Sequence, residues 1–138
     1  LKWPNDILIG DKKVAGILAQ QIGEGVIIGI GLNVAMRADE LPVPTATSLA
    51  ISGSNNLDRN SLLSAFLNRF EKVFHGWDSG SDFLERYRQL SSTLDRQVRV
   101  DVVGRDSIEA KALSITAQGA LILSDGTEVN VGDVVHLR

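Results

Sequence analysis

The spacing of apolar residues changes twice along the chain, and this change limits the folds that the sequence can adopt. Between Asp6 and Val34 the apolar residues form three short runs, DILIG, VAGILAQQI and VIIGIGLNV, which are separated by Asp11-Lys12 and by Gly23-Glu24-Gly25. Short apolar runs bounded by polar or glycine-containing turns are typical of β-strands. We therefore expect three neighbouring strands in this region.

From Ser61 the spacing becomes that of an amphipathic helix with one buried face. The apolar positions are Leu62, Leu63, Phe66, Leu67, Phe70, Val73, Phe74 and Trp77. Asp58 or Asn60 is the expected N-cap of this helix. A second helix is predicted from about Asp82 to Leu90, because Asp82 and Glu85 have the spacing of a capping box.

After Leu94 the apolar residues alternate again, in the runs QVRVDVV, SIEAKALSIT, ALILS and EVNVGDVVHLR. Glycine-containing turns separate these runs, so we expect four or five short strands in a small barrel. Residues 35–60 contain Pro42 and Pro44 and are predicted to be mostly loop, with a short helix around Ser48 to Ile51. The expected fold class is α+β, with a boundary between two domains near residues 92–96.

The totals exclude several kinds of function. The chain has 138 residues, a formal net charge of −3 and no cysteine. Disulfides, thiolate metal sites and a cysteine nucleophile are therefore excluded, and a reducing compartment such as the cytoplasm is the default expectation. The balance of charge is not that of a duplex-DNA binder, and apolar runs are too short to span a membrane.

Asp6 and Lys13 can each be interpreted in two ways. Asn5 and Asp6 follow Pro4, so they could simply be turn residues, and a lysine at the start of an apolar strand is commonly a solvated edge residue. Alternatively, Asp6 and Lys13 lie on neighbouring strands and face one pocket, where the ammonium pairs with anionic oxygens of a substrate. Lys12 is the competing cation, and its expected place in a turn favours exposure to solvent.

The run VIIGIGLNV contains Gly29 and Gly31 as a G-x-G after a strand. The third glycine of a dinucleotide-binding fingerprint is missing, because position 34 is valine, so a dinucleotide fold is disfavoured. The glycines then allow close approach either of another backbone or of a ligand. Asn33 favours a ligand, because an amide both donates and accepts hydrogen bonds and suits the edge of a nucleobase.

Three motifs in one order resemble the biotin protein ligases: K-W-P-N-D at the start, K-x-x-G-I-L at Lys13, and a G-x-G-x-N strand end at Asn33. The resemblance extends to LPVPTATSL and to the remainder of the chain. It implies part of a catalytic domain related to class II aminoacyl-tRNA synthetases in residues 1–94, and an SH3-like domain in residues 95–138. The family's arginine- and glycine-rich loop lies upstream of K-W-P-N-D, so we expect this segment to be the C-terminal half of a ligase and incomplete alone.

Enzymes of this family join biotin to ATP and then pass the biotinyl group to one lysine of a biotin carboxyl carrier protein, such as that of acetyl-CoA or pyruvate carboxylase. The resemblance implies catalytic roles for Lys13 and Asp6. The implied biotin-binding residues are Lys13, Gly16, Leu18 and Gly29, and the implied nucleotide-binding residues are Asn5, Gly31, Asn33 and Arg138. Mg²⁺ should accompany ATP, held mostly by phosphates and water.

Three alternatives remain: a lipoate-attaching enzyme with the same adenylation logic, a biotin-responsive repressor with ligase activity, and a bare SH3-like interaction module. Some relatives carry an acidic residue where this chain has Val134. His75 and His136 lack the partners of a triad or metal site, so both are expected to be structural or exposed. Strands near Ala19 to Ile30 could pair across a two-fold axis in a homodimer, as they do in some relatives.

Overall fold

The computed structural model describes residues 1–104 and 106–137, so the predicted nucleotide contact Arg138 lies outside the described residues. The chain divides into two compact units: Leu1–Asn5 together with Phe83–Arg138, and Asp6–Asp82. Each unit has its own antiparallel sheet and one α-helix, which confirms the predicted α+β class. The division into a catalytic portion and an SH3-like domain at residue 94 stays a prediction.

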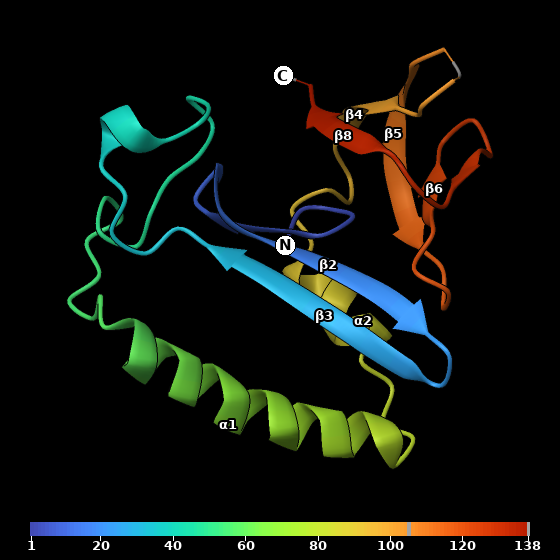
Figure 1. Cartoon of the computed structure of the whole chain (residues 1–138). Coiled ribbons are helices and arrows are strands. Elements are labelled where there is room, and N and C mark those ends of the chain that lie inside the picture. Colours follow the sequence, from blue (N-terminus) through green and yellow to red (C-terminus); the bar gives the residue numbers. More distant parts are fainter. Residues whose placement is uncertain (105, 138) are drawn as a thin grey trace. The chain divides into compact units, whose positions relative to one another are not determined.

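The unit Asp6–Asp82 begins with the three predicted strands. They are β1 (Asp6–Ile9), β2 (Lys12–Ile22) and β3 (Gly25–Leu32), joined as an antiparallel sheet in the order β1-β2-β3 (Figure 1). Gly10 and Gly23 occupy the turns with φ of 58° and 59°, a left-handed backbone that glycine adopts at little cost. Lys12 is the first residue of β2 rather than a turn residue, and its side chain is exposed.

Residues 35–58 form the predicted loop, with one short 3₁₀ helix, η1 (Ala38–Glu40). The helix predicted near residues 48–51 is wrong, because these residues form turns. The Ser48 hydroxyl donates to the Met36 carbonyl and accepts the Ile51 N–H. A serine that binds backbone groups in this way favours turns over a helix.

The helix α1 (Arg59–Asp78) confirms the predicted element and its N-cap. The Asp58 carboxylate accepts hydrogen bonds from the backbone N–H and the hydroxyl of Ser61. Three rings stack in succession along α1: Phe66, Phe70 and Phe74. The predicted burial of this face is wrong, because none of the residues of α1 is buried. Over residues 1–104 and 106–137, no helix combines the length and the apolar character that crossing a membrane requires.

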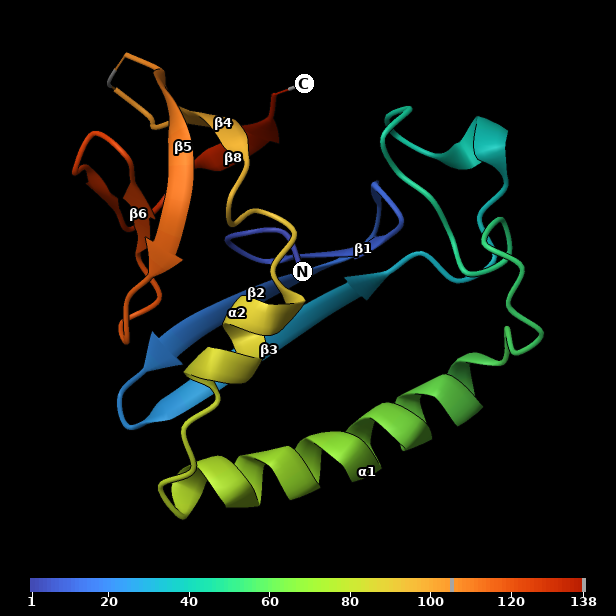
Figure 2. The same ribbon diagram turned by 180° about the vertical axis from the view of Figure 1, so that it is seen from behind.

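The other unit contains α2 (Leu84–Leu90) and a five-stranded sheet. Its strands are β4 (Gln97–Asp101), β5 (Ile108–Ile115), β6 (Leu121–Leu123), β7 (Glu128–Val129) and β8 (Asp133–His136). They pair antiparallel in the order β7-β6-β5-β4-β8, of which Figure 2 labels β6, β5, β4 and β8. This confirms the predicted strands, whereas closure into a barrel stays a prediction. The predicted capping box of Asp82 and Glu85 is wrong, because α2 begins one residue later, with Phe83 as its N-cap.

Trp3 lies in the core of this second unit and is only 3% exposed. The other members of the core cluster are Val98, Val100, Ala110, Ala112, Ile115, Leu121, Leu123, Val129 and Val134. The Trp3 backbone N–H donates to Thr93 Oγ1 at 3.0 Å, and its indole Nε1–H donates to the Gly119 carbonyl at 2.8 Å. The tryptophan of the opening motif therefore anchors the start of the chain to the five-stranded sheet.

Candidate functional site

Several predicted site residues lie on one face of the β1-β2-β3 sheet. Asp6 pairs with Gly16 across β1 and β2, and Gly16 pairs with Gly31 across β2 and β3. Two residues further along β2, Leu18 pairs with Gly29. Directly paired residues of antiparallel strands share a face, and so do residues two apart in one strand. These residues therefore form two adjoining rows on the same face.

A β-bulge brings Lys13 to this face as well. Ile7 pairs with Ala15 but the next residue, Leu8, pairs with Lys13, so β2 has one residue more than β1 at this point. A bulge interrupts the regular alternation and re-aims the side chains beside it. Lys13 Nζ accordingly lies 2.5 Å from Asp6 Oδ1. Regular alternation would have placed Lys13 on the face opposite to Gly16.

Gly16 leaves the space that the Lys13 side chain occupies. A Cβ atom on Gly16 would lie 3.3 Å from both Cε and Nζ of Lys13 and 3.7 Å from Asp6 Oδ1. At Gly31 a Cβ would meet no atom within 4 Å, and at Gly29 it would reach only the Leu18 carbonyl oxygen at 4.0 Å. The face beside Lys13 is thus open over the glycines.

The ion pair joins a buried oxygen to a half-exposed lysine side chain. The Asp6 side chain is 13% exposed and its Oδ1 is buried, whereas the Lys13 side chain is 48% exposed. A carboxylate oxygen shielded from water strongly favours a cationic partner. The ammonium has three N–H donors, so Lys13 can bind Asp6 and a further anion together. Lys12 instead lines a hollow of about 440 Å³ with Pro42, Val43 and other loop residues.

Asn33 follows β3 and is tied to the loop. Its backbone N–H donates to the Val14 carbonyl at 2.9 Å, and its Nδ2 donates to the Thr47 carbonyl at 2.9 Å. The structure therefore brings Asn33 to the strand that carries Lys13, although one of its amide hydrogens is used internally. Contact between Asn33 and a nucleotide stays a prediction.

Asn5 belongs to the other unit, where it lines a hollow of about 530 Å³ together with Asp101, Ser107 and Asp133. Asp101 and Asp133 are directly paired residues of β4 and β8. The hydrogen bond from the Ser107 hydroxyl, assisted by Arg99, holds the pKa of Asp101 below its ordinary value. Asn5 and Lys13 belong to different units, so contact between Asn5 and a nucleotide stays a prediction.

Three other residues were singled out from the sequence, and the structure shows the surroundings of each: His75, His136 and Val134. His75 lies in α1, is exposed, and its ring centroid is 6.4 Å from that of Phe74. His136 Nε2 lies 3.1 Å from Thr93 Oγ1. Val134 is 1% exposed and packs in the core of the five-stranded sheet.

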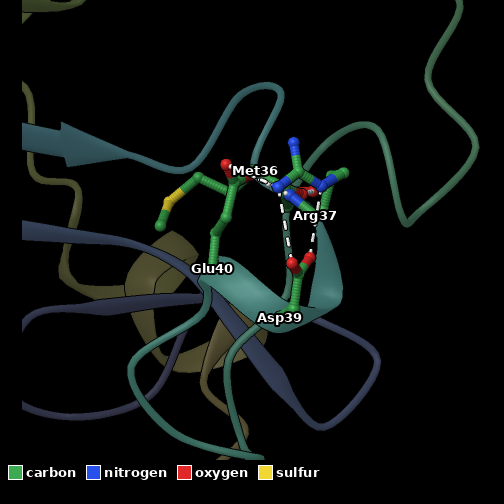
Figure 3. A network of polar contacts seen from close by, with 5 residues as sticks. Met36, Arg37, Asp39 and Glu40 are labelled. Atoms are coloured by element: carbon green, nitrogen blue, oxygen red, sulfur yellow. Dashed lines mark hydrogen bonds and ion pairs between the residues drawn. The ribbon is translucent and has the colours of Figure 1, made fainter.

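Sequence reasoning missed two groups of residues. Around η1, Arg37 Nε lies 3.2 Å from Asp39 Oδ1 and Arg37 Nη2 lies 3.2 Å from Glu40 Oε1, in an exposed network (Figure 3). An arginine followed two and three positions later by acidic residues is the signal that could have indicated it. The second group is Thr47 and Ser48, which are almost fully buried although they lie in a loop. Buried hydroxyl residues need internal hydrogen bonds, which the sequence does not reveal.

The chain is similar to known biotin protein ligases along its whole length. Residues 1–34 match the Biotin/lipoate A/B protein ligase family. The chain is 40% identical to the biotin–[acetyl-CoA-carboxylase] ligase of Mycobacterium tuberculosis, over 100% of the chain and 53% of that protein. It is 30% identical to the bifunctional ligase/repressor BirA of Escherichia coli, over 100% of the chain and 46% of that protein.

Solved structures agree with these sequence relationships. A biotin protein ligase from Aquifex aeolicus in complex with biotin and ATP matches with a TM-score of 0.79 at 27% identity, covering 100% of this chain and 61% of that one. A crystal structure of a biotin protein ligase from Aquifex aeolicus matches with a TM-score of 0.82 at 25% identity, covering 99% and 64%. The chain spans about half the length of the curated relatives that it matches. By sequence and fold together, the chain resembles part of a biotin protein ligase, and its first 34 residues match the Biotin/lipoate A/B protein ligase family.

Proposed function

We propose that this chain is part of an enzyme that activates biotin with ATP to biotinyl-5′-adenylate and transfers the biotinyl group to a lysine of a biotin carboxyl carrier protein. The observation that supports this proposal most is the Lys13–Asp6 ion pair beside the open glycine face of the β1-β2-β3 sheet. The names of the relatives support the same reaction class, and the complex with biotin and ATP supports the two substrates.

The first step brings two anions together. A carboxylate oxygen of biotin attacks the α-phosphorus of ATP, a new P–O bond forms, and the bond to the pyrophosphate leaving group breaks. Lys13 lies at the edge of the open face, where its ammonium neutralises both anions and the negative charge that develops between them. Asp6 holds Lys13 in place for this role.

In the second step the amine of the carrier lysine attacks the biotinyl carbonyl carbon, and AMP leaves with the electrons of the broken C–O bond. The amine must lose a proton in this step. Asp6 is the carboxylate nearest to Lys13 and assists that proton transfer.

The two rows of the sheet face suggest how the substrates lie. Gly16, Leu18 and Gly29 would contact biotin, because Leu18 offers an exposed apolar side chain between positions that have none. Gly31 and Asn33, at the end of β3, would lie by the nucleotide, together with Asn5 and Arg138. Mg²⁺ would enter with ATP, held mostly by the phosphates and by water.

The test is pyrophosphate release by the full-length protein with ATP and Mg²⁺. We expect release that depends on biotin, followed by labelling of an added carrier domain. A lipoate-attaching enzyme is the competing possibility within the same family description. Equal release with lipoate in place of biotin would overturn the proposal.

A cytoplasmic location and a homodimer remain further proposals. β3 is an edge strand of its sheet, and Val26, Ile27 and Ile28 on it are exposed. An apolar edge strand of this kind is a surface on which a second strand can pair. Sedimentation of the full-length protein with and without biotin and ATP would test the dimer.

A further inference from the structure

Where β3 ends, the loop segment Thr45–Thr47 takes its place beside β2. The pairing between β2 and β3 extends only to Ala15 and Leu32. At Lys13 the neighbour is Ala46, in a parallel bridge. The Lys13 backbone N–H donates to the Thr45 carbonyl, and the Lys13 carbonyl accepts the Thr47 N–H, both at 2.8 Å. This loop segment therefore binds both backbone polar groups of Lys13.

The segment is itself fixed from the other side. Ala46, Thr47 and Ser48 are 4%, 3% and 0% exposed. The Thr47 carbonyl accepts Nδ2–H of Asn33 at 2.9 Å, and the Asn33 carbonyl accepts the Leu49 N–H at 2.9 Å. The single residue Thr47 thus connects Lys13, through its N–H, with the Asn33 side chain, through its carbonyl.

This connection bears on where the Lys13 ammonium lies. A lysine side chain is long and has many rotamers, so the position of Nζ depends on where the backbone starts and on what binds the ammonium. Here the loop segment fixes the backbone of Lys13, and Asp6 fixes its ammonium group. A shift of the Lys13 backbone would carry Nζ away from Asp6 and from the open glycine face.

We propose that Asn33 and Thr47 are positioning residues for Lys13. The Asn33 side-chain amide donates to the Thr47 carbonyl, and the Thr47 N–H donates to the Lys13 carbonyl. This role needs no nucleotide, and so it is distinct from the predicted contact between Asn33 and the base. Its effect on the reaction rests on the proposed function of Lys13.

Asn33→Asp in the full-length ligase tests the proposal. The carboxylate has the shape of the amide but no N–H donor, and it places a negative oxygen against the Thr47 carbonyl. We expect single-turnover adenylate formation to slow on the order of 100-fold, the scale that an ångström of misplacement costs. The dissociation constant of biotin should change by less than about twofold, and ATP binding is compared in the second variant, which leaves Asn33 itself unchanged. Without nucleotide, the backbone amides of Lys13 and Thr47 should exchange with deuterium faster.

Thr47→Pro is a second variant, because proline removes the N–H that binds the Lys13 carbonyl and leaves the Asn33 amide and its acceptor unchanged. The same loss of rate with ATP binding retained is expected. Asn56→Asp is the matched control. This substitution also replaces an amide with a carboxylate in the same unit, and it keeps the oxygen that accepts the Asp58 N–H. The rate of adenylate formation and the amide exchange of Lys13 and Thr47 should therefore stay unchanged.

The proposal is overturned if Asn33→Asp weakens ATP binding while the amide exchange of Lys13 and Thr47 stays the same, because Asn33 would then act on the nucleotide alone. It is also overturned if the rate stays normal in both variants. If the unaltered ligase shows no biotin-dependent pyrophosphate release, the proposed function fails. In that case faster amide exchange in Asn33→Asp would still support the positioning of Lys13, and unchanged exchange would overturn it.

Discussion

Lys13 Nζ lies 2.5 Å from Asp6 Oδ1, beside a β-bulge that turns the lysine toward the face on which the aspartate lies. The aspartate oxygen is buried and the lysine side chain is half-exposed. Burial of a carboxylate without a cation is costly, so Asp6 holds Lys13 in place before any ligand arrives. A positive charge that is already in position needs no rearrangement at the moment of reaction, which is what the attack of one anion on another requires.

Lys13→Ala in the full-length enzyme should therefore slow adenylate formation more than it weakens substrate binding. The contact strengthens in the transition state, so its loss appears in the rate. Loss of such an electrostatic contact costs about 3 kcal/mol, or roughly 100-fold in rate. Single-turnover measurements with saturating biotin and ATP would give this number.

Lys12→Ala is the control for that measurement. It removes the same charge one residue earlier in β2, from a side chain that lies beside Pro42 and Val43 instead of Asp6. Its rate should stay close to normal. A slower Lys12→Ala, or normal rates for both variants, would mean that Lys13 is only a solvated edge residue.

Gly16→Ala should disturb the ion pair without removing either charge. The new Cβ would lie 3.3 Å from Lys13 Cε and Nζ, so the end of the lysine side chain must shift by a few tenths of an ångström relative to Asp6. We expect a loss of adenylation rate of about tenfold or more. Gly25→Ala is the matched control in the same sheet, because its Cβ would meet only the Ile22 carbonyl at an ordinary 3.6 Å. Equal rates for the two variants would contradict the steric role of Gly16.

Most strands and the long helix could be predicted because their signals are local, whereas the turns near residues 48–51, where a helix was predicted, could not. Three apolar runs between polar or glycine-containing turns predicted three strands, and the helical spacing after Asp58 or Asn60 predicted α1, whose N-cap is Asp58. The β-bulge could not be predicted, because it depends on how β2 pairs with β1 and not on either sequence alone. The proximity of Lys13 to Asp6 was a hypothesis from their places on neighbouring predicted strands, and the bulge is the physical reason for it.

Long-range contacts explain most of what sequence reasoning missed. Trp3 is a core residue of the five-stranded sheet through a hydrogen bond to Gly119, which lies far along the chain. The buried position of Thr47 depends on contacts with Lys13 and Asn33, each more than ten positions away. The sequence around Trp3 or Thr47 gives no local signal of these contacts, because tryptophan and threonine also occur in exposed loops.

Acid should weaken the N-terminus of α1 through Asp58. The hydrogen bonds from the Ser61 hydroxyl and backbone N–H lower the pKa of Asp58 below its ordinary value of 3.8. A lowered folded-state pKa means that the stabilisation is fully present above pH 3.8 and is lost as the pH falls through the lowered value. The amide shift of Ser61 would follow this loss by NMR. In Asp58→Asn, which keeps an N-cap acceptor but does not titrate there, the dependence should vanish, and its persistence would assign it to another group.

Trp3→Phe should destabilise the unit that contains the five-stranded sheet. Phenylalanine keeps an aromatic ring in the core but lacks the indole N–H, so the Gly119 carbonyl loses its partner. Loss of one partner of an internal hydrogen bond costs about 1–3 kcal/mol, which urea denaturation of the full-length protein would measure. Trp77→Phe is the control, because Trp77 is 62% exposed at the end of α1 and its replacement should change the free energy of unfolding by less than about 0.5 kcal/mol. Equal effects of the two substitutions would show that Trp3 contributes only apolar surface, and that the opening motif is not anchored through its indole.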